Sequence, residues 1–325
     1  MGGKSQSKLW AVLSSWILIL AASAQAGSYA NAESGPGEDG VYLFAYFKSF
    51  WNSSGDGLHL AWSRDGLDWK KLNGGRIYFK PRQGAFRDPF ILQGPDGIFH
   101  MTWTSQAKSI GYAASRDLVA WTDEKYLPVM KQEPGALNCW APEMFYDQAK
   151  KQFLVFWSTT IPGRFPETDS AGDYQYNHRI YYTTTTDFQT FSPARLFFDP
   201  GFNCIDATII KAGDEYVLFL KNETLKPMKK YIVSAQAKSP EGPFGPVSDP
   251  ITPSWSEGPS ALRIGDQWFL YYDLYAANRY GLSGSEDLKE WRDLSSKLEL
   301  PGGARHGCGF KISRQIFLKL SPKMK

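Results

Sequence analysis

Four side chains that can carry protons occupy matching places along the chain. Asp88, Asp206, Glu257 and His306 each stand at the start of a short apolar segment, and Ala141 takes the same place in a fifth. These positions recur at intervals of roughly 50 to 65 residues, which is typical of one structural unit repeated around a centre. Such a repeat would bring the four side chains together at one end of its inner strands.

Carboxyl groups that meet in this way can act as general acid and general base. Negative charge nearby raises the pKa of a carboxyl and suits it to donate a proton, whereas a general base must stay ionised. Two carboxyls about 6.5–9.5 Å apart leave room for one water molecule, which is the arrangement of inverting glycoside hydrolysis. This chemistry requires a fold that joins distant segments.

The segments between these positions have the composition of β-strands. Short runs of β-branched and aromatic residues alternate with turns that contain Gly and Asp, and no amphipathic helix is expected. The clearest runs are residues 41–47, 99–103, 153–157, 216–220 and 268–272. The protein is therefore predicted to be all-β.

A second motif recurs in step with the first. It has a Ser or Thr, an Asp two residues later and then an aromatic residue, so that the polar side chains can close a turn and the aromatic ring can cover a hydrophobic edge. The copies are residues 63–69, 115–121, 185–191 and 285–291, with a degenerate fifth at 239–244.

One repeat thus contains an inner, a middle and a third strand, an Asp turn and an outer strand, which describes a propeller blade. The chain begins with a middle strand at residues 41–47 and ends with an inner strand at residues 307–312. We predict a five-bladed β-propeller whose C-terminal inner strand completes the N-terminal blade, because this removes the open edges of a linear array. Such a ring can also serve as a binding scaffold without catalysis.

Composition narrows the range of partners. The 325 residues are 42% hydrophobic and 15% aromatic, and aromatic faces both pack sheets and stack on sugars. The net charge is +3 without the basic cluster of a nucleic-acid binder, so no nucleic-acid partner is expected. The cysteines Cys139, Cys204 and Cys308 cannot all pair with one another; a Cys139–Cys204 disulfide and buried free thiols are both open.

The N-terminus has the pattern of a secretory signal peptide, residues 1–26. A positive region precedes the apolar run 9–22, and Ala24-Gln25-Ala26 offers a cleavage site. A membrane anchor is the alternative, but the run is short for a bilayer span. We expect a flexible leader at 27–40 and one propeller domain at 41–320, in a monomeric, secreted or periplasmic protein with no membrane contact after cleavage.

Together these motifs resemble glycoside hydrolase family 43, five-bladed propeller enzymes that mostly cleave arabinofuranosides and xylosides. The likeness extends over residues 41–317 and rests on Asp88-Pro89, Trp140-Ala141-Pro142, Asp206-Ala207 and Glu257-Gly258-Pro259 in this order, with a terminal His306-Gly307. The chain departs from the family in one respect. Members commonly carry the Asp-Pro close to the mature N-terminus, whereas here a three-strand section precedes it.

The resemblance implies a role for each carboxylate. Asp88 matches the general base, Asp206 the carboxylate that orients the acid and adjusts its pKa, and Glu257 the general acid. Glu257 would protonate the leaving oxygen while Asp88 takes a proton from the attacking water, with inversion at the anomeric carbon. The alternative is that all three are strand-end carboxylates bound to backbone amides. His306 matches a residue at the ring centre that is often near a calcium ion held through water; no cofactor is expected to be required.

Six further residues are predicted to bind the substrate. Three tryptophans are expected to stack on sugars, with core packing between blades as the alternative, and an Arg beside the base is expected to hold a carboxylate or a hydroxyl. A Glu two residues beyond Ala141 is a rival acid and is interpreted as a structural or substrate-contact residue. The set is Arg87, Trp103, Trp140, Glu143, Lys221 and Trp255.

Residues 162–178 are expected to form a loop over the mouth that narrows it to an exo-acting pocket. The predicted function is a secreted exo-acting glycosidase on plant-type polysaccharides, α-L-arabinofuranosidase first and β-xylosidase or β-galactosidase next. Related fructan-cleaving propellers are a second possibility, but their Asn-Asp-Pro motif is absent. A non-catalytic carbohydrate-binding propeller is a third.

Overall fold

The computed structural model of the protein describes residues 1–2, 40–48, 56–106, 108–172 and 175–321. The predicted signal peptide and leader fall almost wholly on residues 3–39 and so lie outside the described residues. Within the described part, no helix is long and apolar enough to cross a membrane.

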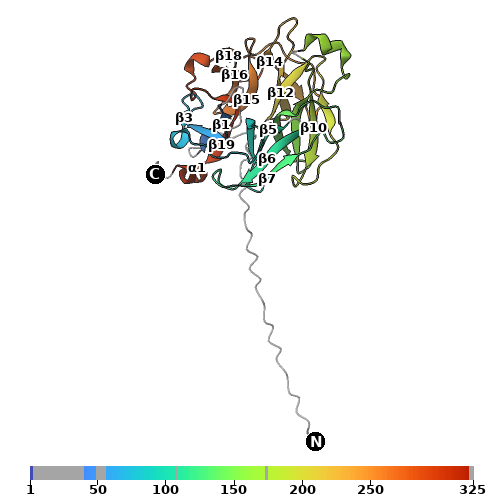
Figure 1. The fold of residues 1–325 in the computed structure, drawn as a ribbon. Helices are drawn as coiled ribbons and strands as arrows, with labels where there is room; N and C mark the ends of the chain where they lie inside the picture. Colours follow the sequence, from blue (N-terminus) through green and yellow to red (C-terminus); the bar gives the residue numbers. More distant parts are fainter. Residues whose placement is uncertain (3–39, 49–55, 107, 173–174, 322–325) are drawn as a thin grey trace.

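Five small antiparallel sheets surround a common centre, as the five-bladed propeller prediction requires (Figure 1). Blades 2, 3 and 5 each follow the chain through four strands, and blade 4 has three. Blade 2 contains β4 (Arg87–Gln93), β5 (Phe99–Gln106), β6 (Ser109–Ser115) and β7 (Trp121–Leu127); blade 3 contains β8 (Trp140–Asp147), β9 (Gln152–Thr159), β10 (Arg179–Thr185) and β11 (Arg195–Phe198); blade 4 contains β12 (Cys204–Ala212), β13 (Glu215–Asn222) and β14 (Tyr231–Ala237); blade 5 contains β15 (Glu257–Ile264), β16 (Gln267–Leu274), β17 (Arg279–Ser285) and β18 (Arg292–Asp293).

Blade 1 joins the two ends of the chain, which confirms the predicted closure. Its order is β19 (Arg305–Ser313), β1 (Gly40–Phe47), β2 (His59–Ser63) and β3 (Lys70–Lys71). The inner strands β19, β4, β8, β12 and β15 contact one another in sequence, and β15 contacts β19 to complete the ring. The inner edges of the five sheets therefore pack against one another around the centre.

The Asp turns also form as expected. In the turn after β6, the Ser115 hydroxyl accepts the Leu118 N–H at 2.8 Å, and Asp117 Oδ1 accepts the N–H groups of Val119 and Ala120 at 2.9 Å. The turns after β2, β10 and β17 repeat these bonds. Each copy thus closes its turn with its own side chains.

Blade 4 has only three strands because the segment after its degenerate turn contains two prolines. Residues 245–251 run beside β14, and the N–H groups of Gly245, Ser248 and Ile251 donate to β14 carbonyls at 2.8–2.9 Å. Pro246 and Pro250 in this segment have no N–H to donate. The segment therefore covers the edge of β14 without forming a regular strand.

The sequence predicted no amphipathic helix, but the structure contains a short α-helix. Helix α1 (Arg314–Leu320) follows β19, and short 3-10 turns occur at η1 (Leu72–Gly75), η2 (Pro166–Ala171) and η3 (Ser295–Lys297). The Ser313 hydroxyl accepts the Ile316 N–H and so caps α1, whose Phe317 ring packs 5.1 Å from that of Trp62. The helix covers the edge of blade 1 with two buried residues, Phe317 and Leu320.

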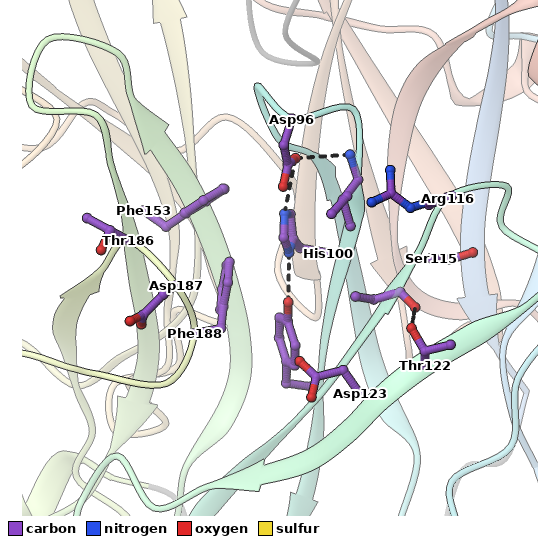
Figure 2. Close-up of a pocket in the computed structure, with 13 residues that line it drawn as sticks. Asp96, His100, Ser115, Arg116, Thr122, Asp123, Phe153, Thr186, Asp187 and Phe188 are labelled. Atoms are coloured by element: carbon purple, nitrogen blue, oxygen red, sulfur yellow. Dashed lines mark hydrogen bonds and ion pairs between the residues drawn. The ribbon is translucent and has the colours of Figure 1, made fainter.

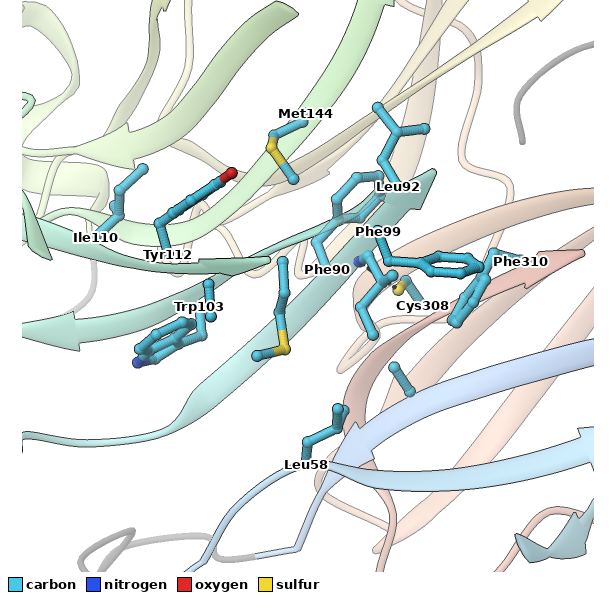
Figure 3. Close-up of a cluster of buried hydrophobic side chains, with 14 of the residues drawn as sticks. Leu58, Phe90, Leu92, Phe99, Trp103, Ile110, Tyr112, Met144, Cys308 and Phe310 are labelled. Atoms are coloured by element: carbon cyan, nitrogen blue, oxygen red, sulfur yellow. Dashed lines mark hydrogen bonds between the residues drawn. The ribbon is translucent and has the colours of Figure 1, made fainter. Parts of the chain in front are cut away.

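The core lies between the blades. Figure 3 shows one such layer, in which Phe310 and Cys308 of β19 meet Phe99 and Leu92 of blade 2. The opposite seam of blade 1 is aromatic, because the fully buried Phe44 on β1 makes edge contacts with Trp69, Tyr271 and Tyr280 at 5.4–5.6 Å. Blade 1, where the ring closes, is therefore packed against a neighbouring blade on both sides.

We expect Phe44→Ala to destabilise the protein by about 3–5 kcal/mol, because it removes the ring at the centre of the seam between blades 1 and 5. Urea unfolding followed by circular dichroism measures this. The exposed Leu196→Ala is the control and should change stability by less than about 0.5 kcal/mol. A loss below about 1 kcal/mol in Phe44→Ala would contradict this account of ring closure.

Candidate active site

Every inner strand bends at the same point through a β-bulge. Two residues of the inner strand stand opposite one residue of the middle strand, as the register breaks in all five blades show. The first bulge residues are Asp88, Ala141, Asp206, Gly258 and His306. A bulge re-aims the side chain it carries, so this ring of bulges turns Asp88, Asp206 and His306 toward one another.

Four of the five bulge residues have a left-handed backbone. The φ angle is 51° at Asp88, 47° at Ala141, 56° at Asp206 and 58° at Gly258. The cost is of order 1–3 kcal/mol for each non-glycine residue, and strain of this kind gathers at functional sites. A Cβ at Gly258 would meet the His306 ring at 2.5 Å, so glycine is required there for the imidazole to approach.

The bulges correct the predicted alignment of the repeats. Glu257 was taken as equivalent to Asp88, but Gly258 occupies that position and Glu257 precedes it. Glu257 therefore lies on the regular part of the strand, directly before the bulge. Its side chain is 23% exposed, compared with 11% for Asp88 and 6% for Asp206. Of the three carboxylates, Glu257 is the most open to solvent.

A residue near the end of the middle strand holds the bulge of the next blade in three of the five blades. Thr104 Oγ1 accepts the Ala141 N–H at 2.8 Å, and Ser158 Oγ accepts the Asp206 N–H at 3.1 Å. On blade 5, Asp273 Oδ2 accepts the His306 N–H at 3.3 Å. These bonds satisfy N–H groups that each bulge leaves unpaired in its own sheet.

His306 joins two of the predicted catalytic carboxylates. Its Nδ1 lies 3.5 Å from Asp88 Oδ1 and 3.9 Å from Asp206 Oδ2, so strands of blades 1, 2 and 4 meet here. Thr104 also donates its hydroxyl to Asp88 Oδ2 at 2.7 Å. Both oxygens of Asp88 therefore face polar partners, which fixes the orientation of its carboxylate.

Asp206 is the carboxylate most affected by burial. Burial raises its pKa from the ordinary 3.8 to about 6, and although His306 opposes the shift, the carboxylates of Glu257 and Asp88 add to it. Asp206 Oδ2 accepts the Gly258 N–H at 3.1 Å, which ties it to the strand that carries Glu257. Asp206 thus lies between the other two carboxylates and interacts with both.

Glu257 faces a cation as well as other carboxyl groups. Lys221 Nζ lies 3.1 Å from Glu257 Oε2 and 2.7 Å from Glu223 Oε2. Lys221 was predicted to contact the substrate, but in the structure its ammonium group is buried in these ion pairs. Its contact with a candidate catalytic carboxylate is a relation that the sequence did not indicate.

Asp273 was not predicted and belongs to the same site. It pairs with Glu257 across β15 and β16, and burial together with the Glu257 carboxylate raises its pKa to about 7. Arg305 Nε lies 3.1 Å from its Oδ2 and opposes the shift. The sequence could have indicated Asp273 by its place near the end of a middle strand, which is equivalent to the places of Thr104 and Ser158.

Two predicted substrate-binding residues lie away from the mouth. Trp103 is fully buried against Phe79 and Phe86, with ring centroids 5.1 and 5.7 Å away, so the sugar-stacking prediction is wrong and core packing holds. Glu143 is also buried, and its Oε2 is out of contact with solvent. Burial raises the pKa of this carboxyl, which is enclosed beneath the mouth, well above its ordinary value.

The other predicted residues remain partly open. Trp140 lies beside Tyr176, with centroids 4.7 Å apart, and Trp255 contacts Tyr275 at 5.8 Å. Arg87 lies over the Phe47 ring at 5.4 Å and retains part of its surface. These residues stand at the same strand ends as Asp88 and Glu257, so they remain candidates for sugar contacts.

The predicted mouth loop is anchored by a buried guanidinium. It joins β9 to β10 at the end where Asp88 lies, and its described part, which omits residues 173–174, includes η2. Arg179 is fully buried, with its Nε 2.5 Å from Asp199 Oδ1 and its guanidinium 4.2 Å from the Phe165 ring centroid. The loop is thus bound to blade 3.

The three cysteines do not form a disulfide, and a direct metal site is absent from the described residues. Cys139, Cys204 and Cys308 are all buried and free, so the Cys139–Cys204 disulfide is wrong and the thiol alternative is confirmed. Among the described residues, no group of three or more His, Cys, Asp or Glu side chains has the arrangement of a metal site. An ion near His306 would have to be held through water.

A separate cavity of about 330 Å³ lies at the other end of the ring, between blades 2 and 3 (Figure 2). His100 forms part of its wall, stacks on Phe188 at 4.6 Å and accepts or donates a 2.8 Å hydrogen bond with the Tyr112 hydroxyl. Asp96 lies 3.7 Å from the other ring nitrogen. This cavity shares no residue with the Asp88 site.

Comparison with known proteins identifies the family. Residues 39–315 match the family model described as a probable glycosyl hydrolase domain, which is related to glycoside hydrolase family 43. The chain belongs to this family. The predicted resemblance is therefore confirmed.

Individual relatives are distant. An α-L-arabinofuranosidase of Bifidobacterium longum subsp. longum is 24% identical over 254 residues, which cover 62% of this chain and 24% of that protein. The chain therefore spans about a quarter of the length of this curated relative.

Solved structures share the fold. An α-L-arabinofuranosidase from Lactobacillus brevis gives a TM-score of 0.53 at 18% identity, covering 67% of this chain and 75% of that one. An endo-1,4-β-xylanase from Bacteroides thetaiotaomicron gives a TM-score of 0.55 at 12% identity, covering 77% and 90%.

The raised pKa of Asp206 predicts a pH-dependent penalty on folding. Between about pH 4 and pH 6 the native protein retains a proton that the unfolded chain has released, so stability falls as the pH rises through this window. Asp206→Asn should remove the penalty. We expect it to increase the free energy of unfolding by up to about 3 kcal/mol at pH 8 and to leave it nearly unchanged at pH 4.

Urea unfolding at the two pH values measures the effect, and the exposed Asp249→Asn is the control, for which no such difference is expected. Equal stability of Asp206→Asn and the wild type at both pH values would show that burial and the neighbouring carboxylates do not raise the pKa of Asp206 in the folded ring.

Proposed function

We propose that the protein hydrolyses glycosidic bonds with inversion, as a secreted enzyme that removes arabinofuranosyl or xylosyl residues from the ends or side chains of plant-type polysaccharides. The observation that carries this proposal is the convergence of Asp88, Asp206 and Glu257, from three different blades, on one end of the ring. Membership of the glycosyl hydrolase family supports a carbohydrate substrate.

Asp88 suits the role of general base. The Thr104 hydroxyl and the His306 ring orient its carboxylate, and its side chain keeps 11% of its surface open. A base must hold a lone pair toward the water it deprotonates, and fixed orientation favours this. His306 and Thr104 are therefore positioning residues for Asp88.

Glu257 suits the role of general acid because it is the most exposed of the three carboxyls. Asp206 is connected to the Glu257 strand through the Gly258 N–H and places a second carboxyl beside it. In the proposed reaction Glu257 gives its proton to the leaving oxygen while Asp88 takes one from water. The water oxygen forms the new bond to the anomeric carbon as the glycosidic bond breaks.

The arabinofuranosyl preference rests on the relatives. The Bifidobacterium protein and the Lactobacillus structure are both named α-L-arabinofuranosidases. Trp140 with Tyr176, and Trp255 with Tyr275, provide partly exposed aromatic pairs for stacking on a sugar ring. A β-galactosidase-type member of the family and a carbohydrate-binding propeller without activity are the alternatives, which a panel of aryl glycosides distinguishes.

The proposal also includes export of the protein and a calcium ion near His306. The N-terminal pattern of residues 1–26 favours a secreted or periplasmic location. Asp88, Asp206 and His306 would hold a calcium ion through water, since carboxylates suit this hard cation. The ion would be structural, so no step of the proposed reaction involves it.

Glu257→Gln and Asp88→Asn should each reduce kcat by about 10²–10⁴-fold with an aryl α-L-arabinofuranoside, because each removes one proton-transfer group. Initial rates with p-nitrophenyl α-L-arabinofuranoside, and with the β-xyloside and β-galactoside, measure this. Glu215→Gln is the matched control, since Glu215 pairs with Lys238 at an exposed position, 2.9 Å apart, and should leave kcat unchanged. Activity that survives in both site variants would rule out the assigned roles.

A further inference from the structure

Four charged groups alternate in sign beside the proposed acid. The Glu257 carboxylate lies 3.1 Å from the Lys221 ammonium, which lies 2.7 Å from Glu223, and Glu223 lies 2.5 Å from Lys230. Lys221 and Glu223 lie at the end of β13 and just after it, and Lys230 directly precedes β14. We call this set the charge chain; it joins blade 4 to the first residue of β15 in blade 5.

The charge chain is largely out of water. The side chains of Lys221 and Lys230 are 3% and 1% exposed, and that of Glu223 is 13% exposed. Burial alone would favour a neutral Lys221, but the carboxylates of Glu257 and Glu223 outweigh burial and raise its pKa well above the ordinary value. Lys221 therefore stays charged and gives the Glu257 carboxylate a permanent cationic partner.

Lys221 departs from the pattern of blades 2, 3 and 5. Its equivalents Thr104, Ser158 and Asp273 place an oxygen acceptor at the end of a middle strand and bind the bulge N–H of the next blade. A lysine has no acceptor, and the corresponding N–H of Gly258 is instead bound by Asp206. The side chain of Lys221 is thus free to contact Glu257, which only blade 5 carries at this position.

We propose that Lys221 is a positioning residue that holds the Glu257 carboxylate through their 3.1 Å contact and so sets the pH above which the enzyme loses activity. Glu223 limits this effect because it shares the same ammonium group. The proposal rests on the function proposed above, in which Glu257 must carry a proton to act as the acid.

Other groups also act on Glu257. Asp206 of β12, Asp273 of β16, Tyr275 just after β16 and Tyr280 of β17 interact with it electrostatically. The two aspartates repel its charge, and the tyrosines are neutral because burial raises their pKa values. His306 and Arg305 of β19 and Asp88 of β4 act one step away, through Asp206 and Asp273. Lys221 is the cation in direct contact.

Two substitutions separate this role from simple structural support, because they change the field at Glu257 in opposite directions. Lys221→Met removes the cation, while Lys230 still pairs with Glu223. The upper limb of the pH profile of kcat/KM should move up by about one pH unit. Glu223→Gln leaves the whole ammonium charge to Glu257, so the upper limb should move down. Lys221→Arg keeps the charge and should leave the limb within a few tenths of a unit.

A second readout does not depend on activity. In protein labelled with ¹³C at the Glu side-chain carboxyl, the Glu257 resonance, assigned through Glu257→Gln, reports the midpoint of its titration directly. We expect the midpoint to move in the same opposite directions in the two variants. If Lys221→Met does not fold, Glu223→Gln, which retains Lys221, provides the test.

The two proposals can fail separately. If the wild type hydrolyses no glycoside, the proposed function fails, while the resonance still tests the contact between Lys221 and Glu257. If the wild type is active and both variants lose rate without moving either the upper limb or the Glu257 midpoint, Lys221 is a structural residue and the inference is overturned. Shifts of both variants in the same direction would overturn it as well.

Discussion

The β-bulge shared by all five inner strands is the constraint on which the site depends. A straight inner strand would direct Asp88, Asp206 and His306 along its ordinary alternation, and the carboxylates would not converge. The left-handed φ angles at Asp88 and Asp206 are unfavourable locally and are held by surrounding bonds, such as that from Ser158 to the Asp206 N–H. Blades 2, 3 and 5 therefore each hold the bulge of the blade that follows.

The electrostatics of the site follow from this geometry. Three carboxyl groups and Asp273 lie around one end of the ring, and burial raises the pKa of Asp206 and of Asp273. The imidazole of His306 lies between Asp88 and Asp206, Arg305 lies beside Asp273, and Lys221 lies beside Glu257. Each of these basic side chains is thus matched to particular carboxyls, and chemically similar groups acquire different environments.

The fold was predictable from the sequence because its signals are local and repeated. The Asp turns form from neighbouring side chains, and the strand order fixed which strand closes blade 1. The placement of Asp88, Asp206 and His306 followed from their shared position at strand starts. The one-residue displacement of Glu257 was not predictable in this way, because a Glu and a Gly adjacent to one another both fit the repeat.

Tertiary contacts account for what the sequence did not reveal. Residues along β5 are buried on both faces, with Trp103 in the core and Thr104 against the next blade, so strand alternation could not show which residue lines the mouth. The contact of Lys221 with Glu257 and the raised pKa of Asp273 depend on pairs that only the closed ring brings together. Burial of the three thiols likewise depends on the packing between blades.

We propose that Asp88 and Glu257 act from opposite sides of the anomeric carbon, with the attacking water beside Asp88. Proton NMR spectra recorded in the first minutes of hydrolysis of an aryl α-L-arabinofuranoside test it most directly, because they identify the anomer released before mutarotation. The account predicts that β-L-arabinofuranose appears first and the α anomer only later. Release of the α anomer first would contradict it and would require a covalent intermediate on one of the carboxylates.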